Sequence, residues 1–396
     1  MKLTPPRSIA TVVTAVLFAI PTADVVADSP SVELIGLARL SGELRDDSSF
    51  DQKLEDGSPA NRFGGLSAIE FTGNGDQFWL LPDRGAGDGA VTYPCRVHLA
   101  KLTVDAKSQA IDFELVSTVP MTSTAGAPLV GSQAISDAEK RSDRSSWTAL
   151  DPEGIRQWNE KTLIISDEYG PHVMAIDTDG KVVKEFSIPE SYRLRAPVDG
   201  VYTRGIYPNR GLEGIAITPS GDTLVTVPQS PLIQDGRIKG DKCLGLNCRW
   251  LVLGNDGSVK RQIVYQLEDE STGVSEVLAV DEHRFLVLER DSKSGDKAKI
   301  KRIFLADIND ASDVSDIDAL PTDAVPAGVR VVKKSVIIDL QDEHFGIGGA
   351  ATPEKPEGLC WGNPLPDGRR TLWVCCDNDF EPNRDTEIFC FAVSGL

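Results

Sequence analysis

Acidic residues bracket a hairpin-like stretch that runs from Asp151 to Gly170, DPEGIRQWNEKTLIISDEYG. Glu153 begins its first apolar run, and Asp167 follows its second. In an antiparallel pair, the start of one strand lies beside the end of the other. We therefore expect both carboxylates at one edge of a sheet, where they suit acid–base catalysis or the binding of a hard metal ion.

The outline of two short apolar runs joined by a polar turn recurs along the chain. The five passages are GGLSAIEF to QFWLLPDRG (64–85), PEGIRQW to TLIISDEYG (152–170), GLEGIAI to TLVTVPQS (211–230), GVSEVLAV to RFLVLERD (273–291) and KPEGLCW to TLWVCCDND (355–379). Most are followed by two further strand-like segments, and repeated four-stranded units are typical of a β-propeller. We predict an all-β protein, a β-propeller of five blades, with six as the alternative. The N-terminal run Val32 to Leu40 would close the ring as the outer strand of the last blade.

Aligned on this outline, the repeats place polar residues at two recurring positions. The position at the start of the first strand holds Ser67, Glu153, Glu213, Glu276 and Glu357. The position at the end of the second strand holds Asp83, Asp167, Gln229, Glu289 and Asp377. Because the innermost strands of a propeller line its axis, we expect these side chains to ring one mouth of the central channel.

Carboxylates gathered in one place repel each other, which raises their pKa values unless a cation is bound. Calcium accepts several oxygen ligands with loose geometry. We therefore predict a calcium site that draws on Glu153, Glu213, Glu276, Glu357, Asp167 and Asp377. The alternative is that these acids form salt bridges with arginines and cap strand ends.

Arginine recurs beside the same positions. A guanidinium group binds phosphate or carboxylate bidentately, so these arginines could hold an anionic substrate. The predicted substrate-binding residues are Arg84, Arg204, Arg210 and Arg290. Their alternative role is to neutralise the ring of acids.

The predicted catalytic residues are Glu153, Glu213, Asp167 and His172. His172, in EYGPHV, is expected at the same sheet edge and could act as an acid or base, although a single histidine is more often structural or exposed. The chain contains no GxSxG, HExxH, P-loop or strand-linked GxGxxG motif. Ser67 replaces glutamate in one repeat and is a weaker candidate as a nucleophile. A metal-bound water with a carboxylate base fits these residues better.

Residues 1–27 have the pattern of a secretory signal, a basic start followed by a short apolar run and small residues. A membrane anchor is the alternative, but the run is too short to cross a bilayer. We expect cleavage near Ala27, a secreted or periplasmic location, and one propeller domain over 28–396. Separate all-β domains would need linkers that the composition does not show. Only 133–144 is expected to form a short helix.

The formal net charge is −19, which disfavours nucleic acid and anionic membranes as partners. We expect a monomer that binds a small molecule and does not insert into a membrane after signal cleavage. The chain has seven cysteines. Export to an oxidising compartment favours disulfides, and Cys243 with Cys248 in CLGLNC is the predicted bridge.

Several motifs together resemble the phytase-like family, named for an esterase-like activity of phytase. They are GGLSAIEF with LLPDRG, DPEGI with ISDEYGPHV, NRGLEGIAITPSGDTL with QSPL, FLVLERD, and KPEGL with CDND. The resemblance extends from about Leu34 to Val393 and implies an exported bacterial β-propeller associated with ester or phosphoester hydrolysis. The cysteine-rich last repeat, the CLGLNC insertion and the LPDRG form depart from the family pattern.

Two functions follow from these observations. The first is a hydrolase of small esters or phosphoesters that works through a calcium-assisted acidic mouth. The second is a non-catalytic secreted propeller that binds a ligand or partner at the same mouth.

Overall fold

The computed structural model describes residues 1–2, 30–140, 147–195, 197–198, 200–240 and 242–396. Apart from its first two residues, the predicted signal sequence over 1–27 lies outside this described part. No helix among the described residues is long and apolar enough to cross a membrane.

The described strands form five units of four antiparallel strands, and each unit runs from an innermost strand outward. The first unit contains β2 (Leu66–Phe71), β3 (Gln77–Pro82), β5 (Arg96–Asp105) and β6 (Ala110–Pro120). The second contains β8 (Pro152–Asn159), β9 (Thr162–Asp167), β10 (His172–Asp177) and β11 (Val182–Glu185). The third contains β12 (Leu212–Ile217), β13 (Thr223–Pro228), β16 (Asn247–Gly254) and β17 (Val259–Gln266). The fourth contains β18 (Gly273–Ala279), β19 (Arg284–Arg290), β20 (Lys301–Asp307) and β21 (Lys333–Asp339). The fifth contains β22 (Lys355–Trp361), β23 (Arg370–Asp377), β24 (Thr386–Ser394) and the N-terminal β1 (Ser31–Leu40).

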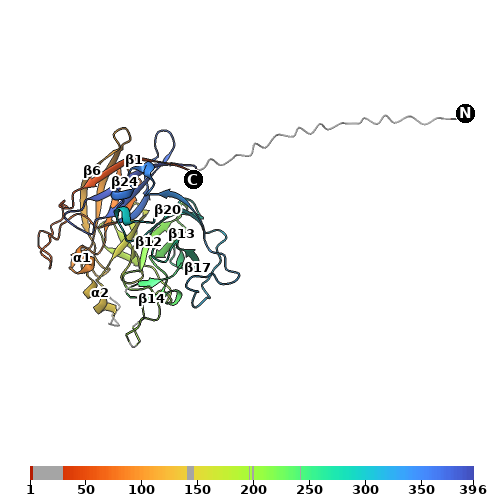
Figure 1. Cartoon of the computed structure of the whole chain (residues 1–396), viewed down its shortest axis with the longest axis horizontal. Helices are drawn as coiled ribbons and strands as arrows, with labels where there is room; N and C mark the ends of the chain where they lie inside the picture. Colours follow the sequence, from red (N-terminus) through yellow and green to blue (C-terminus); the bar gives the residue numbers. More distant parts are fainter. Residues whose placement is uncertain (3–29, 141–146, 196, 199, 241) are drawn as a thin grey trace.

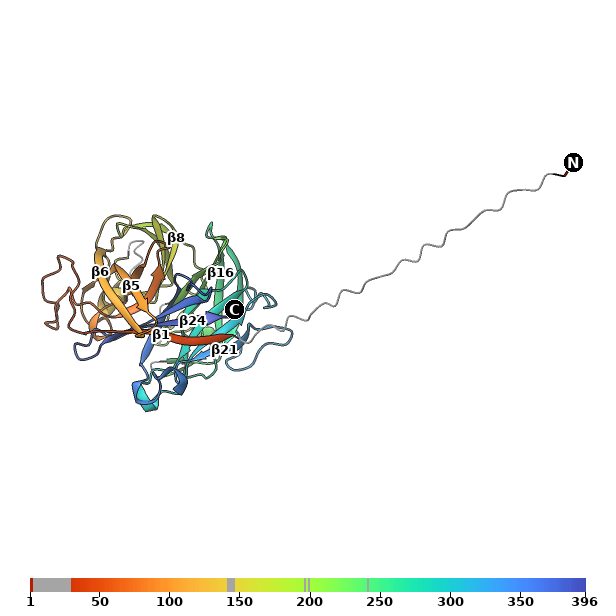
Figure 2. The ribbon, with the colours of Figure 1, turned by 90° about the horizontal axis from the view of Figure 1, so that it is seen from above.

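The five innermost strands β2, β8, β12, β18 and β22 contact one another in a closed cycle. The units therefore surround a common axis, and the predicted all-β propeller fold is confirmed (Figure 1). Strand β1 pairs antiparallel with β24 over almost its whole length and meets β6 through a single parallel bridge. Figure 2 shows β1 lying beside β24. The N-terminal strand thus connects the last unit to the first.

Short elements occupy the loops between these strands. Two small antiparallel pairs are β4 (Tyr93–Pro94) with β7 (Val130–Gly131) and β14 (Arg237–Lys239) with β15 (Lys242–Leu244). The helices are α1 (Ala86–Gly89) and α2 (Gln133–Lys140), with 3₁₀ turns η1 (Ile233–Asp235), η2 (Gly295–Lys297), η3 (Glu343–Phe345) and η4 (Gly349–Ala351). The predicted helix over 133–144 is confirmed as far as Lys140, and its remaining residues lie outside the described part.

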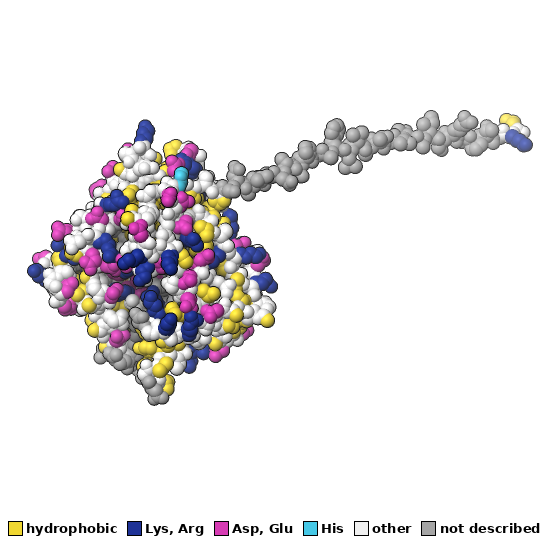
Figure 3. Space-filling view, viewed as in Figure 1, with side chains coloured by type: hydrophobic (Ala, Val, Ile, Leu, Met, Phe, Trp, Pro, Cys, Tyr) yellow, Lys and Arg dark blue, Asp and Glu magenta, His cyan; other side chains and the backbone are white. Residues whose placement is uncertain are grey.

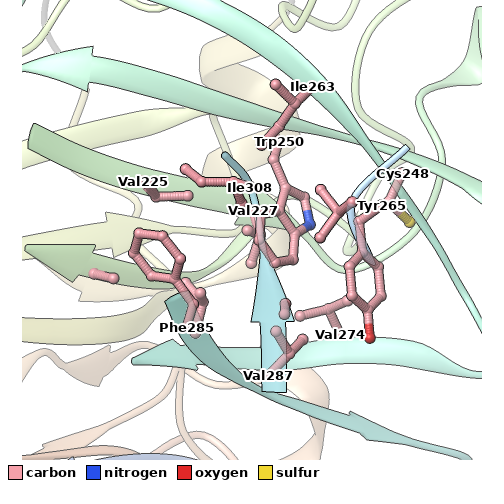
Figure 4. Close-up of a cluster of buried hydrophobic side chains, with 14 of the residues drawn as sticks. Val225, Val227, Cys248, Trp250, Ile263, Tyr265, Val274, Phe285, Val287 and Ile308 are labelled. Atoms are coloured by element: carbon pink, nitrogen blue, oxygen red, sulfur yellow. The ribbon is translucent and has the colours of Figure 1, made fainter. Parts of the chain in front are cut away.

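The hydrophobic core is divided among the interfaces between neighbouring units. Five large clusters of buried side chains each draw on two adjacent units. Figure 4 shows the cluster between the third and fourth units, where Trp250 stacks on Tyr265 with ring centroids 4.8 Å apart and Phe285 packs nearby. Because hydrophobic burial stabilises every interface, the ring holds the inner strands in place without a single central core.

Glycines allow the inner strands to approach each other closely. A Cβ added at Gly154 would lie 2.9 Å from the carbonyl oxygen of Glu213 on the next inner strand. At Gly214 it would lie 2.6 Å from the backbone nitrogen of Val277, and at Gly358 it would lie 2.8 Å from the Cα of Ala68. The axis is therefore filled largely by backbone at this level.

Replacement of Gly214 by alanine is expected to lower the free energy of unfolding by about 1–3 kcal/mol, because the new methyl group meets backbone that cannot move aside. Gly254→Ala is the matched control, since the nearest atoms there are the side chains of Asp256 and Ser258 in an exposed turn. Urea unfolding of both variants checks the difference. Equal stability of the two variants would contradict close packing at the axis.

The predicted disulfide between Cys243 and Cys248 is wrong, because all seven cysteines are buried free thiols. Cys243 lies on β15, opposite Ile238 of β14, whereas Cys248 lies on β16, opposite Tyr265. The Cys248 side chain belongs to the core cluster between the third and fourth units. The five-residue spacing brings the two cysteines close in sequence, but the chain passes from one sheet to another between them.

Candidate active site

A β-bulge in every inner strand places one side chain at the same end of the axis. The strand register shifts at this point in all five units. The residues at the bulge are Ser67, Glu153, Glu213, Ser275 and Glu357, and all of them are buried. A bulge changes the direction of a side chain relative to the strand. The repeated bulge therefore gathers three glutamates and two serines at one mouth of the propeller.

The strand register corrects the sequence alignment of the fourth repeat. Ser275, and not Glu276, is the residue at the bulge. Glu276 stands one position further on, where Gly154, Gly214 and Gly358 stand in other units. Its carboxylate lies inside the axis, 3.0 Å from a guanidinium nitrogen of Arg156. The alignment of the repeats matched Glu276 to the other glutamates by residue type, but the bulge determines which residue faces the mouth.

The second ring of positions also shifts by one residue in two units. In each unit, the member of this ring is the residue whose backbone pairs with the residue two positions before the bulge. These members are Asp83, Glu168, Gln229, Arg290 and Asp377. Asp167 and Glu289, which the sequence alignment placed here, each stand one residue earlier. Asp167 accepts hydrogen bonds from the backbone N–H groups of Asp151 at 2.8 Å and Gly170 at 2.7 Å, so it holds the turn. Glu289 accepts a hydrogen bond from Tyr265 at 3.0 Å and pairs with Lys334.

The second unit contributes a cluster of three buried acids to the mouth. Asp151, Glu153 and Glu168 each place an oxygen within 4.8 Å of the others, so the cluster could hold a metal ion. One guanidinium nitrogen of Arg84 donates to both Asp151 and Glu168, the latter at 2.9 Å. Arg84 therefore already neutralises part of this cluster.

Sequence reasoning missed Asp151, although the repeat contained a signal for it. The residue two positions before the bulge is glycine in three units, Gly65, Gly211 and Gly273. In the second and fifth units it is Asp151 and Lys355. Charged residues at an otherwise glycine position indicate a specific role.

The opposite side of the mouth contains further ion pairs. Glu357 pairs with Arg290 and accepts a hydrogen bond from the Ser67 hydroxyl at 3.2 Å. Lys355 lies 2.9 Å from Asp377. Acidic side chains of the mouth outnumber these basic partners, so part of its negative charge must be neutralised in another way.

Protonation is one such way, because burial raises the pKa values of several mouth carboxyls. Burial, and then the neighbouring acids Glu213 and Asp151, hold the pKa of Glu153 well above its usual range. Burial and the nearby Glu168 raise the pKa of Glu213 in the same way, while Arg290 lowers it. Burial and Asp151 raise the pKa of Glu168 to about 7.

The raised pKa of Glu168 predicts that stability falls as the pH rises from about 4.5, the ordinary value for glutamate, to about 7. A carboxyl with a raised folded-state pKa binds its proton more tightly in the folded protein than in the unfolded chain. Its contribution is complete below the unfolded pKa and is lost as the pH rises through the folded value. Urea unfolding in chelator should show this fall, and Glu168→Gln should reduce its slope because glutamine cannot titrate. A slope unchanged by the variant would contradict the shift.

A small basic pocket of about 40 Å³ adjoins the mouth between the third and fourth units. Arg210, Lys242 and Arg290 line it together with Ser275 and other hydroxyl side chains. One acid, Glu270, also lines it and pairs with Arg237. Two predicted substrate-binding arginines, Arg210 and Arg290, therefore meet at one pocket. Arg204 instead forms an ion pair with Asp318 at 2.7 Å. Figure 3 shows one face of the molecule, on which lysine and arginine side chains gather near the centre.

His172 lies one strand further out than the acids of its unit. It begins β10, which pairs with β9, and stands opposite Asp167. Its ring stacks on Trp147, with centroids 4.4 Å apart. Its position beside the mouth, but not within the bulge ring, separates it from Glu153 and Glu213.

The fold and the site define a β-propeller with a buried acidic cluster at one mouth and a basic pocket beside it. The chain belongs to the Phytase-like family, described as "Esterase-like activity of phytase", which matches residues 61–380. This confirms the resemblance drawn from the motifs and associates the chain with a hydrolase-type function.

Other comparisons give weaker likenesses. An "Uncharacterized secreted protein" of Arthroderma benhamiae is 25% identical over 286 residues, 56% of this chain and 56% of that protein. The chain thus spans about half the length of this relative. The Dos1 propeller has a TM-score of 0.34 with 10% identity, over 85% of this chain and 69% of its own. A luciferin-regenerating enzyme has a TM-score of 0.35 with 10% identity, over 93% and 98%. Scores at this level support no conclusion about this chain.

Proposed function

We propose that the protein is an exported hydrolase of small esters or phosphoesters, with its active site at the acidic mouth. The observation that carries this proposal is the pair of buried glutamates, Glu153 and Glu213, beside the basic pocket of Arg210 and Arg290. The secreted relative and the signal-like residues 1–27 support export.

The basic pocket would bind the substrate's negatively charged oxygens. Arg210 and Arg290 supply guanidinium groups, and Lys242 adds a third positive charge. Guanidinium and ammonium groups stabilise the charge that develops on the acyl or phosphoryl oxygens during hydrolysis. This role favours substrates that carry an anionic group or develop one as they react.

The two glutamates would divide acid and base roles between them. Repulsion between close carboxyls favours a state in which one is protonated and the other ionised. The ionised carboxylate would take a proton from the attacking water, and the protonated carboxyl would give one to the leaving oxygen. Asp167 is occupied by backbone hydrogen bonds and His172 lies one strand further out, so neither is needed for these steps.

Calcium is the proposed cation for the cluster of Asp151, Glu153 and Glu168. These residues fit it because all their ligand atoms are carboxylate oxygens that lie close together. A bound calcium ion would neutralise the acids and polarise an oxygen of the substrate. Arg84 competes for two of the three residues, so calcium binding would have to displace or share its contacts.

The proposal is tested with a panel of aryl esters and aryl phosphoesters, assayed with the purified mature protein in calcium and in chelator. Turnover of either class supports a hydrolase, and a rate that chelator lowers supports calcium. The panel also identifies which of the two substrate classes is preferred.

A non-catalytic binding protein is the second candidate, because Arg84, Arg290 and Lys355 already pair with acids of the mouth. Such pairing can serve structure alone. Absence of turnover across the panel, together with a melting temperature that chelator leaves unchanged, would favour this second function and contradict both catalysis and calcium binding.

A further inference from the structure

A second cavity, of about 500 Å³, lies at the opposite end of the propeller. All five inner strands begin at the acidic mouth, so their last residues gather at the other end. Phe71, Trp158, Ile217 and Trp361, from the ends of four inner strands, line this cavity, the aromatic pocket. Its volume is typical of a small-molecule site, and its walls combine these apolar side chains with polar and charged ones.

The aromatic pocket is separated from the mouth by a plug within the axis. The guanidinium group of Arg156 donates to the carbonyl oxygen of Val277 at 2.9 Å and pairs with Glu276 at 3.0 Å. These contacts join the second and fourth units across the axis, at the level where glycines bring the inner strands together. A ligand of the aromatic pocket therefore enters from the opposite face, independently of the proposed active site.

The charged groups that line the aromatic pocket are Glu70, Arg156 and Arg370. Glu70 already lies 3.6 Å from Arg156 and accepts a hydrogen bond from the backbone N–H of Gln157 at 3.0 Å. The guanidinium group of Arg370 lies 3.5 Å from the centroid of the Trp361 ring. Among the described residues, no carboxylate forms an ion pair with Arg370. The uncompensated charge in the pocket is therefore positive.

An anion at Arg370 would meet two requirements at once. It would supply the counter-ion for a half-buried guanidinium group, which loses part of its hydration in the pocket. An aromatic body attached to that anion would cover the apolar walls formed by Trp158, Trp361 and Phe71. A cation would be repelled by Arg370, whose stacking also leaves less of the Trp361 face for cation–π contact.

We propose that the aromatic pocket binds a small aromatic anion, an aryl carboxylate or sulfonate, with its charged group on Arg370 and its aromatic body against the apolar side chains of the pocket wall. This site is separate from the acidic mouth, and it does not depend on whether the mouth is catalytic.

Two fluorescent probes with the same aromatic body test the proposal in the full mature protein. The probes are 8-anilinonaphthalene-1-sulfonate, an anion, and N-phenyl-1-naphthylamine, its neutral counterpart. We expect the wild type to bind the sulfonate at a single site about tenfold more tightly than the amine, because a charge-assisted hydrogen bond is added. Arg370→Gln should remove this preference by weakening the sulfonate alone. The neighbouring Arg369→Gln is the control, since Arg369 pairs with Glu33 and Asp367 outside the pocket.

A second variant adds a negative charge without disturbing the core. Ser220 lines the aromatic pocket from an exposed turn, so Ser220→Asp should weaken sulfonate binding and leave the amine unaffected. Melting temperatures would show whether each variant remains folded. Equal affinity for both probes, or sulfonate binding unchanged in both Arg370→Gln and Ser220→Asp, would overturn the proposal. Because no substrate turnover is measured, its failure is distinct from failure of the hydrolase.

Discussion

Replacement of Arg84 by methionine is expected to lower the free energy of unfolding by about 3–5 kcal/mol. Arg84 is buried and donates to both Asp151 and Glu168, so its loss leaves two buried carboxyls without their cation. The effect should be smaller near pH 5, where the Glu168 carboxyl, whose pKa burial raises to about 7, can take up a proton. Chemical unfolding at two pH values measures both expectations.

Arg193→Met is the control for this loss. Arg193 is exposed and pairs only loosely with Glu190, at 3.8 Å, so its replacement should change stability little. If the cluster holds calcium, calcium should restore part of the stability lost in Arg84→Met. Equal stabilities of the Arg84 and Arg193 variants would show that the buried ion pairs do not hold the mouth together.

Replacement of Glu153 by glutamine is expected to lower kcat by a factor of about 10²–10⁴, the contribution typical of a general acid or base. Glutamine keeps the shape of the side chain but cannot transfer a proton. Initial rates on the preferred aryl substrate measure the effect, and the melting temperature shows that the fold is kept.

Glu160→Gln is the matched control for this variant. Glu160 lies in the turn of the same hairpin, between β8 and β9, and is exposed. Its replacement makes the same chemical change far from the mouth and should leave kcat unchanged. Equal kcat values for the Glu153 and Glu160 variants would show that Glu153 is not a catalytic acid or base.

The fold could be predicted because its determinants are local. Each unit alternates short apolar runs with turn residues such as Gly73, Gly221 and Gly368, which adopt positive φ values in the structure. Buried strands and polar turns repeat at intervals that a sequence comparison can detect. The convergence of acids on one mouth followed from this topology, since every inner strand begins at the same end.

The sequence did not predict which individual residues line the mouth. A bulge adds one residue without changing the hydrophobic pattern, so the sequence alone did not distinguish Ser275 from Glu276. For the same reason, the sequence did not show which of the neighbours Asp167 and Glu168 belongs to the mouth. Only Glu168 is part of the acid cluster, whereas Asp167 binds backbone N–H groups. Residue type guided the alignment in both units, and in both the backbone pairing decided otherwise.

Long-range contacts were also beyond the sequence. Arg210 and Lys242 come from separate loops, and nothing in their spacing indicated that they line one basic pocket. The predicted Cys243–Cys248 bridge failed for a related reason, because proximity in sequence did not reveal that the two residues belong to different sheets. By contrast, alternation along a strand is a local rule, and adjacent Cys375 and Cys376 accordingly enter different core clusters.

The pH dependence of kcat/KM for the preferred aryl substrate tests the acidic mouth most directly. Glu153 and Glu213 in opposite protonation states predict a bell-shaped profile for the wild type, with an ionised base required on one limb and a protonated acid on the other. Glu213→Gln should remove one limb, and the exposed Glu160→Gln should keep both. A profile that is flat, or that keeps both limbs in Glu213→Gln, would contradict a glutamate pair as the catalytic acid and base.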